Sequence, residues 1–220
     1  MAKVKFNITS FKITTPVIKL QNDIKKAIIK KFETESPLRK KLDGPNSINI
    51  ELAKFFYQKL IESNTFVSMM HGDLRAEFGF TDSYLEQLDD ICVAIATVYL
   101  NYKVSSGKDF LTIIIGLHDK DDFDYEEYGV FTTEKGEKIY WLYWLLTQGT
   151  TPVVPGYKVL KKDGRGRSNL AIMINKDDGS YNYSVDSLHA GTVEDNWITR
   201  VLNENKEEFL VILKKNFNGT

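Results

Sequence analysis

A dense aromatic run, Tyr140-Trp141-Leu142-Tyr143-Trp144, restricts the fold of this chain more than any other feature. Each large aromatic side chain has about 150–250 Å² to bury, so the run requires a core beside it. Trp141 and Trp144 share one face of a helix predicted over residues 138–148, which Gly149 ends. We expect both indoles to be largely buried, at least one of them in the core. The alternative is that one ring, with a neighbouring tyrosine, anchors an adjacent subunit.

The chain has 220 residues, of which 42% are hydrophobic, and this suits a single domain with or without an attached arm. A chain of this size buries about 70% of its unfolded surface and needs no covalent staples. Its single cysteine, Cys92, excludes an intrachain disulfide and lies in an apolar run, which predicts a core position. No apolar stretch approaches the roughly 20 residues of a membrane span, and the N-terminus lacks a signal-peptide pattern, so neither is expected.

Hydrophobic periodicity and turn residues predict an α+β fold, in which helices pack a small antiparallel sheet. Helices are expected at about 49–62, 71–79, 83–90, 138–148 and 192–216, the last being a long C-terminal helix. Strands are expected in a hairpin over 92–117 and in a meander over 153–185. Because residues 84–100 also fit one long helix, the start of the hairpin stays open.

Residues 1–45 are expected to form a region of their own, followed by a single α+β domain at 46–220. The first 20 residues mix Thr, Ile, Val and Lys without a helical period. This pattern predicts an extended N-terminal arm or an edge strand, and we expect these residues to pack partly on another chain. A short helix is expected after the arm, to about Phe32.

The net charge is only −1, but the charges are segregated along the chain. Residues 1–45 carry 11 basic and 4 acidic side chains, and residues 158–176 carry 6 and 1. Residues 73–140 carry 6 basic and 15 acidic side chains. Such segregation favours self-association, in which a basic region meets a neighbour's acidic face. An unevenly charged, solvated surface is the alternative.

Two arginines, Arg165 and Arg167, lie on a glycine-flanked turn expected between two strands. Side chains at such a tip point away from the core, and guanidinium groups bind carboxylates in a bidentate manner. We therefore predict that both contact another chain. Their candidate partners are Asp119, Asp121, Asp122 and Asp124. This acidic loop resembles a calcium loop only superficially, because it lacks the glycine at the sixth position and the glutamate at the twelfth.

The sequence shows no residue pattern typical of a catalytic or metal site. His71, His118 and His189 do not have the spacing of a zinc-binding helix. The turn at 164–168 lacks the G-K-S/T ending of a phosphate-binding loop and precedes a strand, and no serine lies in a nucleophile elbow. We therefore expect no cofactor, no metal and no enzymatic activity.

Four segments carry recognisable motifs in a fixed order. Ser68 with 72–80 is similar to a small residue followed by G-x-L-R-x-E-x-G, and 139–149 is similar to W-L-x-W-L-L-x-x-G. Residues 167–173 are similar to R-x-G-x-A-I-M, and 190–200 to A-G-T-x-x-D-N-F-I-x-R. Together they resemble virion proteins of tailed bacteriophages, of the neck, head–tail connector and tail-completion type.

The resemblance covers about residues 50–215, with Asn169 where the pattern has glycine. It implies a non-enzymatic structural subunit of a tailed-phage particle, in a homo-oligomeric ring at the neck or head–tail junction. The implied partners are other virion proteins, such as portal, adaptor or tail proteins, with incidental contact to packaged DNA and none to a membrane. The implied location is the virion, assembled in the host cytoplasm.

Two other functions remain open. A nucleic-acid- or carbohydrate-binding module would use the Arg165 and Arg167 tip or the face with Trp141 and Trp144. An enzyme, such as a nuclease or an amidase, is the third hypothesis.

Overall fold

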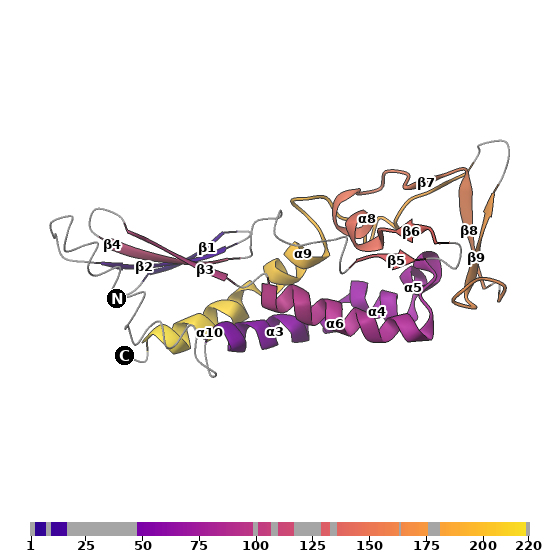
Figure 1. Ribbon diagram of the computed structural model, residues 1–220. Helices are drawn as coiled ribbons and strands as arrows, with labels where there is room; N and C mark the ends of the chain where they lie inside the picture. Colours follow the sequence, from indigo (N-terminus) through magenta and orange to yellow (C-terminus); the bar gives the residue numbers. More distant parts are fainter. Residues whose placement is uncertain are drawn as a thin grey trace. The chain divides into compact units, whose positions relative to one another are not determined.

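The computed structural model describes residues 3–7, 10–16, 48–98, 101–106, 110–116, 129–132, 136–162, 164–175 and 181–218. In this part of the chain helices combine with small antiparallel sheets, in agreement with the expected α+β class (Figure 1). The chain divides into two compact units. Unit 1 comprises Met1–Gln58, Ala94–Phe123 and Leu202–Thr220, and unit 2 comprises Lys59–Val93 and Asp124–Val201. The boundary expected at residue 45 and the short helix expected to Phe32 lie outside the described residues.

Unit 1 contains a four-stranded antiparallel sheet in the order β1-β2-β4-β3. Its strands are β1 (Lys3–Asn7), β2 (Ser10–Pro16), β3 (Asn101–Ser106) and β4 (Phe110–Gly116). The inner strand β2 places Ile13 opposite Ile113 of β4. Both N-terminal strands are extended, as expected, but their backbone groups pair within the chain's own sheet. A separate N-terminal arm is therefore not confirmed.

The segment after Ser83 forms one long helix, α6 (Asp82–Val98), and not the first part of a hairpin. The side chains that α6 buries recur at helical spacing: Tyr84, Leu88, Ile91, Cys92, Ile95 and Ala96. Burial along this stripe outweighs the strand preference of the β-branched residues. The alternative of a long helix is thus correct, and the strand pairing begins only at Asn101.

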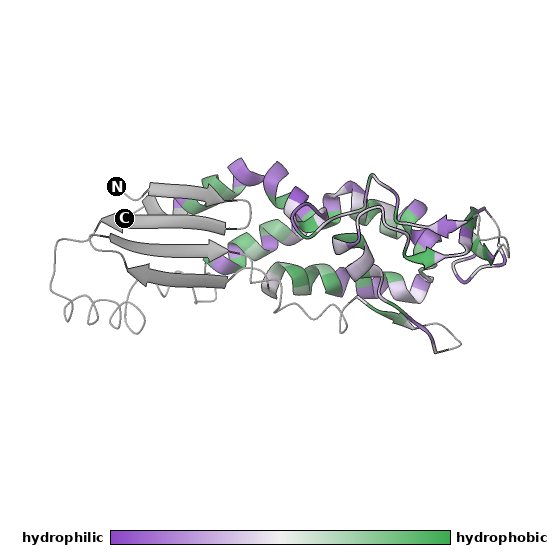
Figure 2. Cartoon of the chain, turned by 90° about the horizontal axis from the view of Figure 1, so that it is seen from above, coloured by the Kyte–Doolittle hydropathy of each residue, from purple (hydrophilic) through white to green (hydrophobic). Residues whose placement is uncertain are grey.

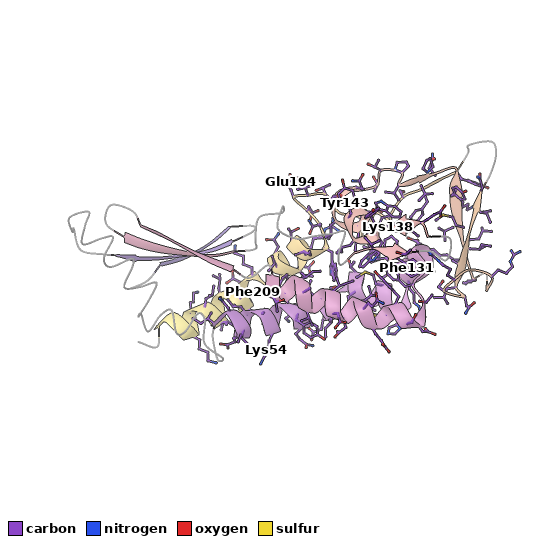
Figure 3. The ribbon with its side chains drawn as sticks, viewed as in Figure 1. Lys54, Phe131, Lys138, Tyr143, Glu194 and Phe209 are labelled. Carbon is purple, nitrogen blue, oxygen red and sulfur yellow. The ribbon has the colours of Figure 1, made fainter. Side chains whose placement is uncertain are left out.

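The helices of unit 1 pack through aromatic side chains. Helix α3 (Ile48–Glu62) covers the range expected at 49–62, and its Phe56 is completely buried. Phe209 of α10 (Lys206–Asn218), labelled in Figure 3, packs against two rings of α3. The centroid of its ring lies 4.8 Å from that of Phe55 and 6.0 Å from that of Phe56. Figure 2 shows hydrophobic and hydrophilic residues alternating along such helices, as one buried side requires.

The expected single C-terminal helix is instead two helices. Helix α9 (Trp197–Glu204) ends before Asn205, and α10 starts at Lys206. The helix also begins later than the sequence suggested, because Asn196 and not Thr192 caps it. Thr192 belongs to the preceding turn, in which its backbone N–H donates to Asp195 O at 2.8 Å.

Short helices open unit 2. Helix α4 (Asn64–His71) begins at Ser63, whose hydroxyl accepts the N–H of Phe66. Helix α5 (Asp73–Phe78) follows and ends at Gly79, which has the left-handed φ of 69° predicted for a terminating glycine.

In the part of unit 2 that the structure describes, the strands form three two-stranded sheets. Their pairs are β5 (Phe131–Thr132) with β6 (Lys138–Ile139), β7 (Val154–Pro155) with β10 (Asn182–Tyr183), and β8 (Tyr157–Lys161) with β9 (Ala171–Asn175). The β8–β9 pair is the first hairpin of the expected meander, but β10 pairs with β7 and not with β9, so the meander does not continue. Helix α8 (Trp141–Thr147) is shorter than predicted, because Lys138 and Ile139 pair as a strand.

Candidate functional site

A pocket of about 640 Å³ opens in unit 2 beside α5, α8 and the β8–β9 hairpin. Its polar and aromatic lining side chains are Glu77, Phe78, Glu137, Lys138, Trp144, Tyr157, Arg165, Arg167 and Tyr183. Three residues selected from the sequence, Trp144, Arg165 and Arg167, therefore line the same pocket. Among the lining residues that the structure describes, none is a histidine, cysteine or serine.

The two tryptophans of the aromatic run have different environments. Trp141 is completely buried, which confirms that at least one indole lies in the core. Its Nε1–H donates to the hydroxyl of Tyr84 at 2.7 Å, and its ring lies 5.1 Å from the ring of Phe80. Trp144 is half-buried and faces the pocket. The run therefore supplies one core residue and one pocket residue.

Arg167 does not point away from the core, as was expected of both arginines. Its Nη2 donates to the carbonyl of Phe78, the last residue of α5, at 3.3 Å. Its guanidinium also lies 4.3 Å from the centre of the Phe131 ring. A cation at a helix C-terminus satisfies a free carbonyl and the helix dipole, which explains the inward position. Arg165 is exposed, so contact with another chain remains a prediction for this residue.

The expected partners of these arginines, Asp119, Asp121, Asp122 and Asp124, lie outside the described residues. Their pairing with Arg165 remains a prediction.

A buried carboxylate links α5 to the strands of unit 2. Glu77 binds Lys161 of β8 at 3.0 Å and accepts the hydroxyl of Tyr183 of β10 at 3.2 Å. Lys161 also binds Asp73 at 2.7 Å. One lysine thus bridges two carboxylates on successive turns of α5 and fixes the hairpin against this helix.

Burial and the bonds within the cluster act in opposite directions on the pKa values of Glu77 and Lys161. Burial raises the pKa of Glu77, although hydrogen bonds from Lys161 and Tyr183 oppose the rise. Burial also opposes the charge of Lys161, but its bonds to Asp73 and Glu77 outweigh this effect and raise its pKa. The difference follows from exposure, since the side chain of Glu77 is 8% exposed and that of Lys161 is 38% exposed.

The first phage-like motif forms the junction between α4 and α5. A Cβ on Gly72 would lie 2.9 Å from the Cα of Ser68, so only glycine fits there. The Ser68 hydroxyl accepts the N–H of Leu74 at 3.2 Å. Arg75 donates to Met70 O at 3.3 Å and pairs with Asp82 of α6. These motif residues hold three helices together.

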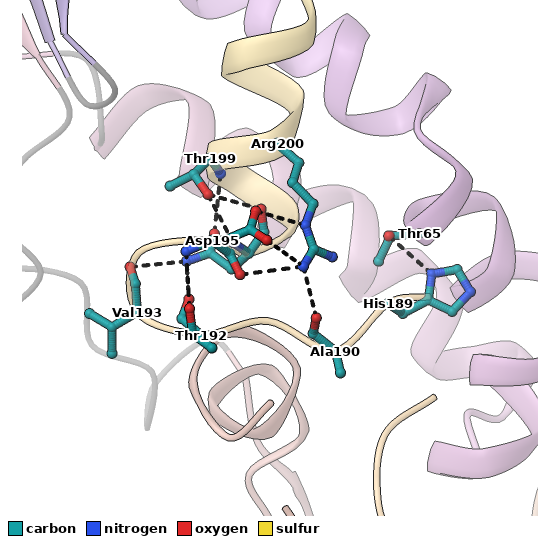
Figure 4. Close-up of polar contacts among 9 residues, drawn as sticks. Thr65, His189, Ala190, Thr192, Val193, Asp195, Thr199 and Arg200 are labelled. Atoms are coloured by element: carbon teal, nitrogen blue, oxygen red, sulfur yellow. Dashed lines mark hydrogen bonds and ion pairs between the residues drawn. The ribbon is translucent and has the colours of Figure 1, made fainter. Parts of the chain in front are cut away.

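The last phage-like motif encloses the start of α9 (Figure 4). Arg200 binds both carboxylate oxygens of Asp195, at 2.9 and 3.0 Å, and donates to Ala190 O at 3.0 Å. Asn196 caps the helix through the N–H of Thr199. Its neighbour Gly191 has no room for a side chain, because a Cβ would lie 2.9 Å from Leu145 O in α8.

The departure from the third motif has a structural explanation. Asn169 stands where the pattern has glycine, and its φ is 56°. Asparagine tolerates the left-handed region better than most residues, so it preserves the turn that glycine would make. The substitution is therefore consistent with the motif.

Among the histidines and the cysteine that the structure describes, His189 and Cys92 are buried, and His118 lies outside the described residues. His189 is buried, and its Nδ1 lies 3.1 Å from the Thr65 hydroxyl, whereas His71 is exposed. Cys92 is buried, as predicted, and burial raises the pKa of its thiol. Within the described ranges, no group of three or more His, Cys, Asp or Glu side chains could hold a metal ion. None of the helices described there is both long and apolar enough to cross a membrane.

Sequence reasoning did not find the Glu77 cluster. Glu77 and Tyr183 are 106 positions apart, and neither belongs to a local pattern that indicates the other. The only signal was the glutamate of the first motif, whose role could not be read without the fold.

Comparison with known proteins identifies no relative: no protein-family model, no curated protein and no solved structure matches this chain.

Proposed function

We propose that the chain is a structural subunit of a tailed-phage particle and forms part of an oligomeric ring at the neck or head–tail junction. The observation that carries this proposal is the convergence of the four phage-like segments in unit 2. Phe78 of the first segment meets Trp141 of the second and binds Arg167 of the third. Gly149 of the second donates to Gly191 of the fourth at 2.8 Å.

The motif residues contact one another within unit 2, and Glu77, Trp144 and Arg167 also line the pocket. Glycines lie where two segments of backbone pass too close for a side chain. Arginines bind carbonyls and carboxylates, and aromatic rings fill the core. Residues used in this way specify a shared fold and not a shared reaction. This supports the assignment of the four segments to one group of assembling proteins.

The test is the presence of the chain in purified particles. Particles from the strain that encodes the protein are separated on a density gradient, analysed by mass spectrometry and imaged with an antibody against the chain. We expect a fixed number of copies per particle and labelling where head and tail meet. Absence of the chain from intact particles would overturn the proposal.

The exposed basic hairpin favours one second candidate, a nucleic-acid-binding module. Lys158 and Arg165 are both exposed on it. A dedicated binder loses affinity steeply with salt, because it releases counterions from the phosphates. Fluorescence anisotropy with DNA and RNA oligonucleotides over a salt series separates the candidates, and tight binding with a steep salt slope would favour this one.

A further inference from the structure

The β8–β9 hairpin has one face turned to its own unit. Residues paired across an antiparallel ladder share a face, and Lys161 pairs with Ala171. Lys161 binds the carboxylates of α5, and Ala171 is buried. Figure 1 shows this hairpin at one end of unit 2, beside α5.

The other face of the hairpin is aliphatic with a basic edge. Here Leu160 pairs with Ile172, and Lys158 pairs with Ile174. Leu160 is 36% exposed and Lys158 is exposed, whereas Ile172 and Ile174 are half-buried and Ile172 also lines the pocket. Arg165 is exposed in the segment that joins the two strands, where it lines the same pocket. A two-stranded hairpin has little stability of its own, so aliphatic residues on its outward face are typical of a surface that meets a partner.

Helix α6 offers a surface of opposite charge in the same unit. Glu86, Asp90 and Val93 are exposed and follow one another at i, i+4 and i+7. Helix α6 contains four acidic residues and no lysine or arginine. Carboxylates four residues apart on a helix repel each other, by a few tenths of a kcal/mol. Val93, 44% exposed, gives this acidic stripe an apolar end.

We propose that the outward face of the β8–β9 hairpin of one copy docks on the acidic stripe of α6 of a second copy. Lys158 and Arg165 then face Glu86 and Asp90, in place of the acidic loop that the sequence predicted as the partner of Arg165, and Leu160 covers Val93. The two surfaces differ, so the contact is head-to-tail and repeats from copy to copy, as a ring requires. The inference rests on the proposed function, for which it names the surfaces that join the subunits.

Charge reversal tests the contact through complementation. The variant K158E/R165E carries an acidic hairpin and an acidic stripe, and the variant E86K/D90K carries two basic surfaces. In sedimentation velocity at low ionic strength, where the Debye length is about 30 Å at 0.01 M salt, we expect each variant to be monomeric. Their equimolar mixture should associate, because each hairpin then meets a stripe of opposite charge. The variant K54E/K214E, with two exposed lysines of unit 1 reversed, should associate like the native chain.

Cysteine capture tests the same contact by an independent measurement. Chains with Leu160→Cys and chains with Val93→Cys, both in a Cys92→Ala background, are mixed under mild oxidation. We expect several-fold more L160C–V93C heterodimer than L160C–V211C heterodimer, Val211 being an exposed valine of α10. Equal yields, or a variant mixture that stays monomeric, would overturn the inference. If only this contact is wrong, the chain is still detected in particles but the variant mixture does not associate. If only the proposed function is wrong, the mixture still associates but the chain is absent from particles.

Discussion

Replacement of Trp141 by alanine should be among the most destabilising single changes in unit 2. The side chain is completely buried, donates to the Tyr84 hydroxyl at 2.7 Å and contacts the rings of Phe78 and Phe80. Truncation of a buried tryptophan leaves a cavity and costs about 3–5 kcal/mol. This is a large fraction of the roughly 5–15 kcal/mol by which a protein is stable. This cost exceeds the free energy lost with one hydrogen bond, which contributes only about 1 kcal/mol.

Urea denaturation followed by circular dichroism measures the effect. With a denaturant slope of about 2 kcal/mol/M, the midpoint should fall by about 1.5–2.5 M for Trp141→Ala. Tyr143→Ala, on the exposed side of the same helix, is the matched control and should change the free energy of unfolding by less than about 1 kcal/mol. A loss below about 1 kcal/mol for Trp141→Ala, or an equal loss for the control, would refute the core assignment of this indole.

Three further changes test separate features of unit 2. A Cβ on Gly166 would overlap the carbonyl of Ala171, whereas a Cβ on Gly164 meets nothing nearer than 4.0 Å. Gly166→Ala should therefore cost about 1–3 kcal/mol in thermal unfolding, and Gly164→Ala clearly less. Burial lowers the pKa of His189 from 6.5, so the unfolded chain binds more protons and stability should fall as the pH drops below 6.5. His189→Asn should flatten this slope in urea titrations, with His71→Asn as the control at an exposed position. Asn196→Ala should cost about 1 kcal/mol through the lost helix cap, and Asn196→Asp, which keeps an acceptor, should recover most of it; equal losses would contradict the cap.

The sequence predicted which types of residue make interactions, but not where their side chains point in the fold. The glycine-flanked turn correctly indicated a hairpin between 157–161 and 171–175. It could not indicate that Arg167 turns inward, because that depends on the free carbonyl of Phe78 and the ring of Phe131, which lie far away in the chain. The same limit hid Glu77, whose partners come from two strands that join α5 only in the folded unit.

Local chemistry determined much of this protein from sequence alone: the helix expected at 49–62, the helix end at Gly79, the buried Cys92 and the core position of at least one of the two indoles. These features depend on neighbours within one or two turns of chain, so periodicity and glycine geometry are sufficient to predict them. Only the tertiary structure decided that β2 pairs with β4, where Ile13 meets Ile113. It also decided that residues 82–98 form one helix, because the same β-branched residues suit a strand or a helix until one face is buried.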